Sequence, residues 1–298
     1  MPREAEPSAN EKQFLLQALQ EGLRLDGRAF DEYRKLDLTL GDEYGTADVS
    51  LGQTRVLVNI SAEVTVPFPD RQFDGIFQIS TELSPMASPH FEPNRTTETE
   101  ILLSRLLEKT IRRSGALDTE SLCLVAGSKV WSVRADVHVL AHDGNLVDAA
   151  CLATVAALRH FRKPDTAIES GELTIFTPAE REPVPLGWLH SPYCVTFGFF
   201  GDEGETVLLD PDWREEHLAV GSCTFGLNKH GEVCHVTKLG GEPVEATTLL
   251  KCAAIAGQKI KELSDLVDAK LAEDGRRRDK GGLISELLSA ENERVPDA

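Results

Sequence analysis

The sequence predicts a fold of mixed helices and strands, of the α/β or α+β class. Three observations support this class: an alternating strand followed at once by a buried helix at residues 130–161, several alternating segments before the first long helix, and strand pairs ahead of a long amphipathic helix near the C-terminus. No repeat of solenoid length and no glycine-rich nucleotide loop is present in the sequence.

The segment 130–161 is the unit around which we expect the rest of the chain to fold. Its first part alternates, with Trp131 and Val137 among the residues predicted to face a core. Residues 142–145, His-Asp-Gly-Asn, have turn chemistry, and residues 146–158 are then almost continuously apolar. A helix that is apolar on every side is buried. We expect a functional site at the turn between the strand and this helix.

The N-terminal part predicts a short helix and then several strands. Ser8 and Glu11 form a capping-box pattern before a helical apolar repeat that ends near Gly22. Apolar residues then alternate at 36–40, 55–64 and 77–83, which indicates strands. The next helix opens with a second capping box, and its predicted buried face carries Leu103, Leu106, Leu107 and Ile111.

The C-terminal half predicts strands followed by a helix. Residues 193–199 alternate as a strand, and residues 219–238 read as a hairpin around the turn at Asn228. Residues 249–267 then carry apolar side chains at helical spacing, which predicts a long amphipathic helix.

Domain organisation follows from composition. Residues 164–192 are rich in proline and contain one clear strand, at 172–176, so we expect a subdomain boundary there. From about Glu273 the chain is charged and is expected to be loosely ordered, with the basic run at 276–280 as a solvated tail or a nuclear-targeting signal. The predicted organisation is an N-terminal helix at 1–22, a first subdomain at 23–190, a C-terminal subdomain at 191–272 and a charged tail at 273–298.

Composition narrows the class of protein. The chain has 298 residues, of which 41% are hydrophobic and 27% charged, as expected for a soluble globular protein, and it contains neither a secretory signal nor a membrane-spanning run. Its six cysteines are scattered without a Cys-x-x-Cys pair, which favours buried thiols of an intracellular protein. The formal charge of -18 disfavours nonspecific nucleic-acid binding, so any such contact needs a local basic stripe.

The residues by themselves give no strong catalytic signature. The histidines lack metal-ligand spacing, no serine lies in a nucleophile elbow, and Cys151 falls inside the buried helix. We expect neither a metal nor another cofactor. Glu215 and Glu216 form the one close carboxylate pair that follows a strand ending in an Asp-Pro turn. A stripe of Arg105, Lys109 and Arg112 is either an ordinary solvated helix face or a surface that follows RNA phosphates.

Several blocks of the sequence resemble the RNase PH family. They are Leu-Asp-Gly-Arg at 25–28 and the segments 47–56, 111–123 and 137–164, in that order. Residues 143–150 and 193–229 are similar, more narrowly, to the polymyositis/scleroderma-autoantigen-type ring subunits of the eukaryotic RNA exosome. The similarity spans roughly residues 10–275. It implies an α+β fold, the RNase PH-like (ribosomal protein S5 domain 2-like) fold with two β-α units sharing a core.

The resemblance also implies that a phosphorolytic site has degenerated. Active members carry Gly-Thr-Arg or Gly-Ser-Arg after the Asp-Gly turn to hold phosphate, whereas this chain has Val147 at the arginine position. Glu216 matches the first of two catalytic carboxylates, and Ser222 stands at the second. Valine cannot bind phosphate, and serine cannot act as a carboxylate, so the resemblance implies no catalysis.

RNA contact is implied at a different place. Arg105 and Lys109 match positions at which the inactive subunit type of related archaeal rings contacts RNA, and Arg95 matches an arginine near the phosphate site of active members. Arg112 continues the same stripe. The resemblance therefore favours the RNA alternative for these four cations.

The function implied is that of a non-catalytic structural subunit of the exosome core ring in 3′-to-5′ RNA processing and degradation, including rRNA processing. The implied partners are other RNase PH-like subunits in a hexameric ring, S1/KH-type cap subunits, a hydrolytic exoribonuclease and single-stranded RNA, with no membrane, in the nucleus and nucleolus and also the cytoplasm. Two alternatives stay open. One is an active phosphorolytic exoribonuclease, and the other is a metabolic enzyme that binds a small anion at Asp143-Gly144, disfavoured because no cation is near that turn in sequence.

Overall fold

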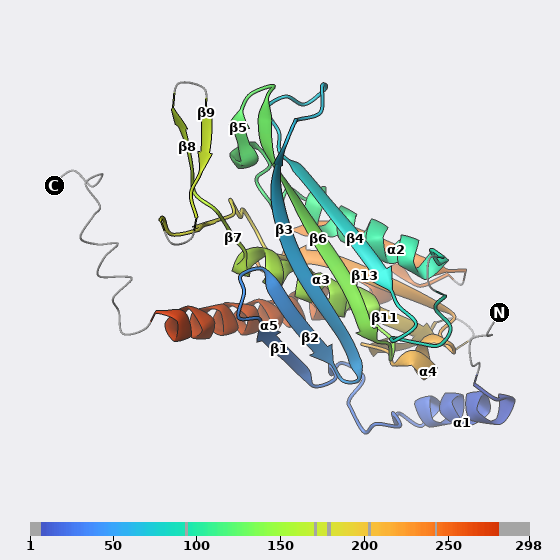
Figure 1. The fold of residues 1–298 in the computed structure, drawn as a ribbon. Coiled ribbons are helices and arrows are strands. Elements are labelled where there is room, and N and C mark those ends of the chain that lie inside the picture. Colours follow the sequence, from blue (N-terminus) through green and yellow to red (C-terminus); the bar gives the residue numbers. More distant parts are fainter. Residues whose placement is uncertain are drawn as a thin grey trace.

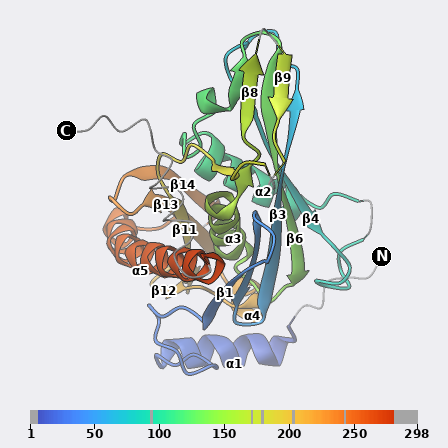
Figure 2. The same cartoon turned by 60° about the vertical axis from the view of Figure 1, so that its left-hand side comes forward.

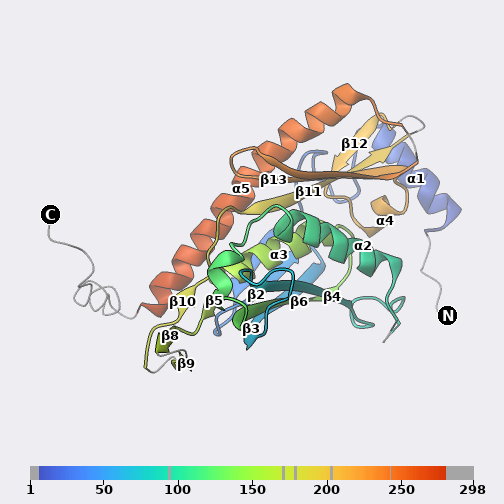
Figure 3. The same ribbon diagram turned by 90° about the horizontal axis from the view of Figure 1, so that it is seen from above.

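The computed structural model describes residues 7–92, 95–169, 172–177, 180–201, 204–241 and 243–279. The main elements form layers, which Figure 1 shows from the side and Figure 3 from above. A six-stranded sheet is covered by α2 (Glu98–Leu107) and α3 (Leu146–His160), a four-stranded sheet lies on the other side of these helices, and α5 (Ala246–Arg278) covers its outer face. Mixed helices and sheets in these layers confirm the predicted α+β class.

The six-stranded sheet contains the segments that the alternation predicts as strands. Its members are β1 (Leu36–Leu40), β2 (Thr46–Leu51), β3 (Thr54–Thr65), β4 (Ile76–Leu83), β5 (Cys123–Val125) and β6 (Lys129–Ala141). The order is β1-β2-β3-β6-β4, with β5 paired to β6. β3 is antiparallel to β6, whereas β4 is parallel to β6 and ends the sheet. The predicted inward residues of β6, Trp131 and Val137 among them, are buried.

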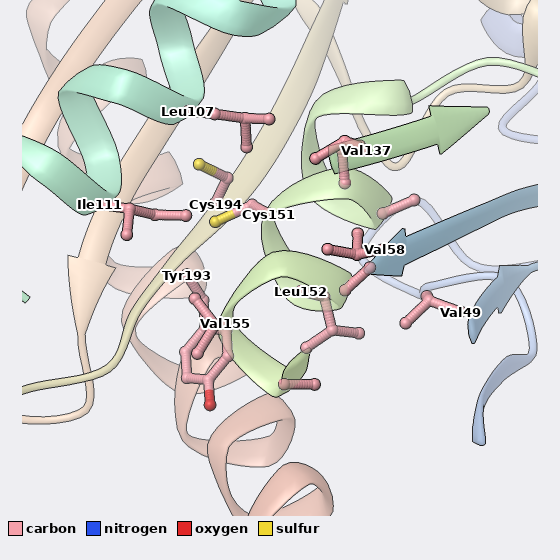
Figure 4. Packing of buried hydrophobic residues seen from close by; sticks show 14 of the residues in the cluster. Val49, Val58, Leu107, Ile111, Val137, Cys151, Leu152, Val155, Tyr193 and Cys194 are labelled. Atoms are coloured by element: carbon pink, nitrogen blue, oxygen red, sulfur yellow. The ribbon is translucent and has the colours of Figure 1, made fainter. Parts of the chain in front are cut away.

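Helix α3 lies between the two sheets, which explains why its sequence is apolar all round. Figure 4 shows Leu152 on the side of Val58 in the six-stranded sheet and Cys151 on the side of Cys194 in the other. Thirteen residues of α3 are buried, and many of them are alanines that let both sheets approach closely. Each fully buried Val or Leu in such a position contributes about 1.5–3 kcal/mol through burial alone. The predicted buried helix is confirmed.

The four-stranded sheet is antiparallel and has the order β12-β11-β13-β14. Its strands are β11 (Pro192–Phe200), β12 (Thr206–Leu209), β13 (Gly221–Asn228) and β14 (Val233–Gly240), which include the predicted hairpin. All nine residues of β11 are buried, where simple alternation predicts one exposed face. The difference arises because α3 packs on one face of β11 and α5 on the other.

The proline-rich segment 164–192 contains more structure than the one strand predicted for it. β8 (Thr166–Glu169) and β9 (Glu172–Ile175) form a hairpin that projects from one end of the molecule in Figure 2. β7 (Arg162–Lys163) pairs with β10 (Val184–Pro185) below it. Two-residue strands leave no periodic signal, so local sequence could not indicate this pairing.

The remaining helices begin where the capping signals indicate. α1 (Ala9–Gln20) and α2 both have complete capping boxes, and α4 (Trp213–Glu216) has a third. α2 continues into a π-helical turn, η1 (Glu108–Arg112), and a short 3-10 turn, η2 (Glu120–Leu122), follows. In the part of the chain that the structure describes, none of the helices is both long enough and apolar enough to cross a membrane.

Helix α5 corrects the prediction for the start of the tail. The chain stays helical through Glu273 and on to Arg278, where a loosely ordered segment was expected. The rest of the predicted tail, from residue 280, lies outside the described residues. Charge-rich composition indicates solvation, but here tertiary contacts hold the last helical turn.

Those contacts form a cluster that we call the C-terminal latch, made of His160, Asp274 and Arg278. Arg278 forms an ion pair with Asp274 and donates to the carbonyl oxygens of Gly41 and Asp42, at 2.6 and 2.7 Å. His160 Nε2 lies 3.1 Å from an Asp274 carboxylate oxygen, and both side chains are buried. The latch therefore joins α5 to the β1–β2 turn and to the end of α3.

We predict that Arg278→Ala lowers the free energy of unfolding by about 1–3 kcal/mol, because it leaves the buried Asp274 carboxylate with fewer donors. Arg276→Ala is the matched control, since Arg276 is exposed in the same turn and has no ion pair with a described residue. Urea unfolding followed by tryptophan fluorescence measures both variants. Equal effects of the two substitutions would contradict a latch at Arg278.

Candidate functional site

A cavity of about 330 Å³ lies where the strand–helix unit meets the four-stranded sheet. Its walls come from α2, the first turn of α3, the β12–α4 turn and the start of β13. The sequence-predicted positions Val147, Glu216 and Ser222 all line it. The other lining residues are Leu106, Asn145, Leu146, Thr196, Gly198, Pro211, Ala219, Val220, Gly221, Thr224, Leu239 and Gly240. Val147 therefore shares one space with Glu216 and Ser222, which come much later in the chain.

The Asp-Gly turn before α3 packs directly against α4. Gly144 has a φ of 80°, and a Cβ atom there would lie 2.6 Å from the backbone of Asp212 and of Trp213, so only glycine fits. Asn145, with a φ of 51°, donates its backbone N–H to Glu216 Oε1 at 2.7 Å. The Glu216 carboxylate is thus held at the N-terminus of α3, where a helix favours negative charge.

Asp210 connects this turn to the N-terminal segment. Its fully buried carboxylate accepts hydrogen bonds from the backbone N–H, Nε and Nη2 of Arg34, at 2.8, 3.0 and 2.8 Å, and from Arg28 at 3.1 Å. Asn145 Nδ2 donates to the same carboxylate at 2.6 Å. Burial alone would raise the pKa of Asp210, but donation from Arg34, its charge and the Asn145 amide hold that pKa below the usual value.

Arg24, and further contacts of Arg34, are committed to structural roles in the same region. Arg24 forms a buried, two-point ion pair with Glu215, with nitrogen–oxygen distances of 3.0 and 2.6 Å. Arg34 also donates to the carbonyl oxygens of Asp143 and Gly144. Arg24 and Arg34 thus stabilise α4 and the Asp143-Gly144 turn, and neither of them lines the cavity.

Sequence reasoning missed Arg34, which is more than 100 residues from the turn it contacts. The small-anion alternative was disfavoured because no cation is near the turn in sequence. The structure does bring a cation, Arg34, to Asp143. Its guanidinium is nevertheless neutralised by Asp210 and Asp143, at 2.8 and 3.4 Å. The block at 25–28 was the available signal, because Arg28 belongs to the same network.

Asp148 anchors α3 beneath the cavity. Its carboxylate accepts hydrogen bonds from Tyr33, Asn145 and the backbone and hydroxyl of Thr196, at 2.8–3.0 Å. Burial raises the pKa of Asp148 to about 6, and the Asn145 and Thr196 donors oppose the shift. The Thr196 hydroxyl also lies 3.0 Å from that of Thr224, so both threonines that line the cavity already have partners.

Glu216 is the one ionisable side chain that lines the cavity among the described residues. The residue as a whole is exposed, whereas its carboxylate accepts a hydrogen bond from the Asn145 N–H at the wall of the cavity. Desolvation of that carboxylate raises the pKa of Glu216 to about 7, while the Asn145 N–H and the charge of Arg34 oppose the shift. No group of three or more His, Cys, Asp or Glu side chains in the described residues is placed to hold a metal ion.

The predicted RNA-contacting cations lie just before α2, on α2 and on η1, outside the cavity. Arg105 and Arg112 both pair with Glu108, at 3.3 and 3.0 Å, so they flank one carboxylate. Lys109 is exposed and forms no ion pair with a described residue. Arg95 pairs with Glu92 at 3.2 Å. Leu106, next to Arg105, lines the cavity, so the stripe borders it without entering it.

The chain belongs to the 3′ exoribonuclease family, the RNase PH family. The model for domain 1 of that family matches residues 32–164, and the model for domain 2 matches residues 190–259. These matches cover both sheets and every residue of the cavity. The predicted family and fold are confirmed.

Within this family the chain is similar along its whole length to one group of proteins. It is 48% identical over 294 residues to Exosome complex component rrp45 of Schizosaccharomyces pombe, covering 99% of this chain and 100% of that protein. It is 46% identical over 306 residues to Exosome complex component RRP45 of Saccharomyces cerevisiae, covering 99% of each. Exosome complex component RRP45 of Homo sapiens is 43% identical over 285 residues, which are 96% of this chain and 65% of the human protein.

Solved structures agree with the family assignment. A chain of an Archaeoglobus fulgidus exosome with RNA bound to the active site has a TM-score of 0.75 and 31% identity, covering 85% of this chain and 96% of that one. A chain of an archaeal exosome core has a TM-score of 0.71 and 28% identity over 86% and 96% of the two chains. The likeness extends across both sheets.

The raised pKa of Glu216 predicts a pH-dependent contribution to stability. Because the folded-state pKa of about 7 exceeds the ordinary value of 4.5, the folded state binds the proton more tightly, and stability from this group is lost as pH rises through 7. Glu216→Gln keeps an acceptor for the Asn145 N–H and is always neutral. We therefore expect its stability, relative to the parent chain, to increase from pH 5 to pH 8.

Urea unfolding at a series of pH values measures this trend. Glu63→Gln is the control, because Glu63 is an exposed carboxylate on β3 and is far from the cavity lining. If the Glu216→Gln curve ran parallel to the parent curve, Glu216 would titrate like an ordinary surface carboxylate.

Proposed function

We propose that this chain is a non-catalytic structural subunit of the core ring of an RNA exosome. In that role it supports 3′-to-5′ RNA processing and degradation, including rRNA processing, and contributes to the RNA path through the central channel. Whole-length similarity to proteins named as exosome complex components supports the assembly, as does the fold shared with archaeal exosome chains. The residues that line the cavity support the absence of catalysis.

The charge of the cavity is the main observation that supports a non-catalytic role. Among the described residues that line it there is no Lys, Arg or His, and Glu216 supplies a carboxylate. A phosphorolytic reaction brings a phosphate dianion against an RNA phosphodiester, so its site needs cations or several convergent donors. Val147 offers only an apolar surface at the entrance of α3. This cavity would repel the anion that the reaction requires.

The carboxylate side of the site is equally incomplete. Ser222 contributes a hydroxyl where active members have a second carboxylate, and a hydroxyl is neither a base near neutral pH nor a strong metal ligand. Glu216, with its pKa of about 7, is partly protonated at neutral pH and is engaged by the Asn145 N–H. An active exoribonuclease would have to bind phosphate at some other place.

RNA contact is assigned in this proposal to Arg95, Arg105, Lys109 and Arg112. Arg105, Lys109 and Arg112 are exposed on α2 and η1, while Leu103, Leu107 and Ile111 anchor those turns in the core. Their side chains can therefore reach a passing backbone without disturbing the fold. Lys109 is the strongest candidate for a phosphate contact, because Arg105 and Arg112 must share their charge with Glu108.

Partners would cover the apolar surface that the chain leaves exposed. Phe14, Val236 and Leu250, on α1, β14 and α5, are 61%, 52% and 72% exposed, and we propose that subunit contacts cover such side chains. We propose that other RNase PH-like subunits in a hexameric ring, S1/KH-type cap subunits and a hydrolytic exoribonuclease complete the assembly on single-stranded RNA. Such an assembly acts in the nucleus and nucleolus and also in the cytoplasm.

One prediction from the proposed function concerns catalysis. Incubation of the chain with single-stranded RNA and inorganic phosphate should release no nucleoside diphosphates above background, because the cavity lacks a group that holds phosphate. An active phosphorolytic exoribonuclease under the same conditions is the positive control. Release of nucleoside diphosphates that disappears in Glu216→Ala would overturn the non-catalytic assignment.

Another prediction concerns RNA. In the ring reconstituted with its related subunits, changing Arg105 and Lys109 to Glu should weaken RNA binding and flatten its salt dependence. Each lost phosphate contact removes about one unit from the slope of log affinity against log salt. Lys251→Glu with Lys261→Glu on α5 is the charge-matched control. Titration of labelled RNA at several salt concentrations measures affinity and slope. Unchanged values would assign Arg105 and Lys109 to a solvated helix face.

A further inference from the structure

A second cavity, of about 380 Å³, lies beside the cation stripe and is lined almost entirely by polar side chains. Its lining comes from β4, β6 and the α2–η1 segment, and consists of Gln78, Ile79, Ser80, Ser104, Glu108, Arg112 and Arg134. We call it the β4 notch. Figure 1 shows α2 running alongside β4, the strand that ends the six-stranded sheet.

The two arginines of the β4 notch come from different elements. Arg112 belongs to η1, whereas Arg134 is on β6, where it is paired in register with Gln78 of β4. Because β4 is the last strand, the long Arg134 side chain can reach across it to the open edge of the sheet. A cation from the sheet thus joins the end of the stripe on α2 and η1.

Both arginines are organised by carboxylates and still have donors to offer. Arg134 uses Nε to bind Asp136 at 2.7 Å, and Arg112 uses Nη1 to bind Glu108 at 3.0 Å. A guanidinium has five N–H donors in a planar fork, so each retains several that these bonds do not use. The Arg134 and Arg112 side chains are 57% and 44% exposed, which leaves them accessible to a ligand.

From this arrangement we propose that the β4 notch binds one phosphodiester unit of single-stranded RNA. Arg112 and Arg134 bind the phosphate, while the Gln78 amide and the Ser80 and Ser104 hydroxyls offer donors and acceptors to the ribose. The inference rests on the proposed RNA contact of Arg105 and Lys109 and extends that path from α2 to the edge of the six-stranded sheet.

Two properties of the notch favour RNA over a protein partner. Cores of protein interfaces are depleted in charged groups and rich in large apolar or aromatic ones, whereas the notch has three charged side chains and only Ile79 as an apolar wall. Arginine forks and short polar side chains are the groups that contact phosphate and sugar in nucleic-acid complexes. The carboxylates of Glu108 and Asp136 limit the net charge, so each contact should be modest.

The experiment compares Arg134→Ala with Arg55→Ala in the reconstituted ring. Arg55 is a closely matched control, because it is also a strand arginine of the same sheet, is 55% exposed and pairs with Asp48 as Arg134 pairs with Asp136. Affinity for a labelled oligouridylate is measured at several salt concentrations, together with the mass of the ring. We expect Arg134→Ala to weaken binding about threefold to tenfold and to flatten the salt slope by about one unit, and Arg55→Ala to change neither.

Arg134→Lys provides a further readout. It retains the charge but not the fork, so the salt slope should stay near that of the parent ring while affinity falls in part. Unchanged affinity and slope in Arg134→Ala, with clear loss in the Arg105 and Lys109 double variant, would overturn the β4 notch and leave the proposed function standing. Loss in neither variant would overturn both. A ring that fails to assemble with Arg134→Ala would make the notch a subunit contact and overturn its assignment to RNA.

Discussion

One buried carboxylate, Asp210, holds together the three segments that define the cavity. It accepts hydrogen bonds from Arg28 and Arg34 of the N-terminal segment and from Asn145 at the start of α3, and it is itself part of the turn into α4. Among the described residues, Asn145 and Asp210 are the two non-glycine positions with positive φ, and they bind each other at 2.6 Å. Such conformations persist only where the surroundings over-determine them.

The partners of Asp210 depend on one another. Removing either arginine would leave a buried charge with fewer donors, and breaking a buried pair of this kind costs about 3–5 kcal/mol. Replacing Gly144 would force α4 away from the turn, because a Cβ there has no room against Asp212. The architecture around the cavity is therefore under structural constraint whether or not the cavity catalyses a reaction.

The shape of the cavity is therefore fixed by residues other than those that would give it a chemical activity. Val147, Glu216 and Ser222 line one cavity because the Asp210 network aligns their segments, yet the arginines of that network, Arg24, Arg28 and Arg34, are committed to carboxylates or backbone carbonyls. A family fold can thus be maintained by contacts that are separate from the residues lining its cavity. The cations for which we propose RNA contact lie elsewhere, on α2, on η1 and in the β4 notch, on a chain whose formal charge is -18.

Local sequence was a good guide where one element determines its own structure. Alternation predicted β6, continuous apolarity predicted the burial of α3, and Ser8 and Thr97 marked helix starts, because side-chain periodicity and caps act over a few residues. The family motifs also pointed to three residues, Val147, Glu216 and Ser222, that line one cavity. The short β7–β10 pairing and the burial of both faces of β11 were not predictable, because each depends on an element distant in sequence.

The sequence by itself therefore determined the family, the order of the main elements and the residue types at the positions that line the cavity. Only the tertiary structure decided how the remaining charges are used. Arg34 lies 109 residues from Asp143, and Arg278 lies 118 residues from His160, so neither contact leaves a periodic or local signal. Whether a cation binds a ligand or stabilises the fold depends on the carboxylates that surround it in space, and the layered packing around α3 brings those carboxylates to their positions.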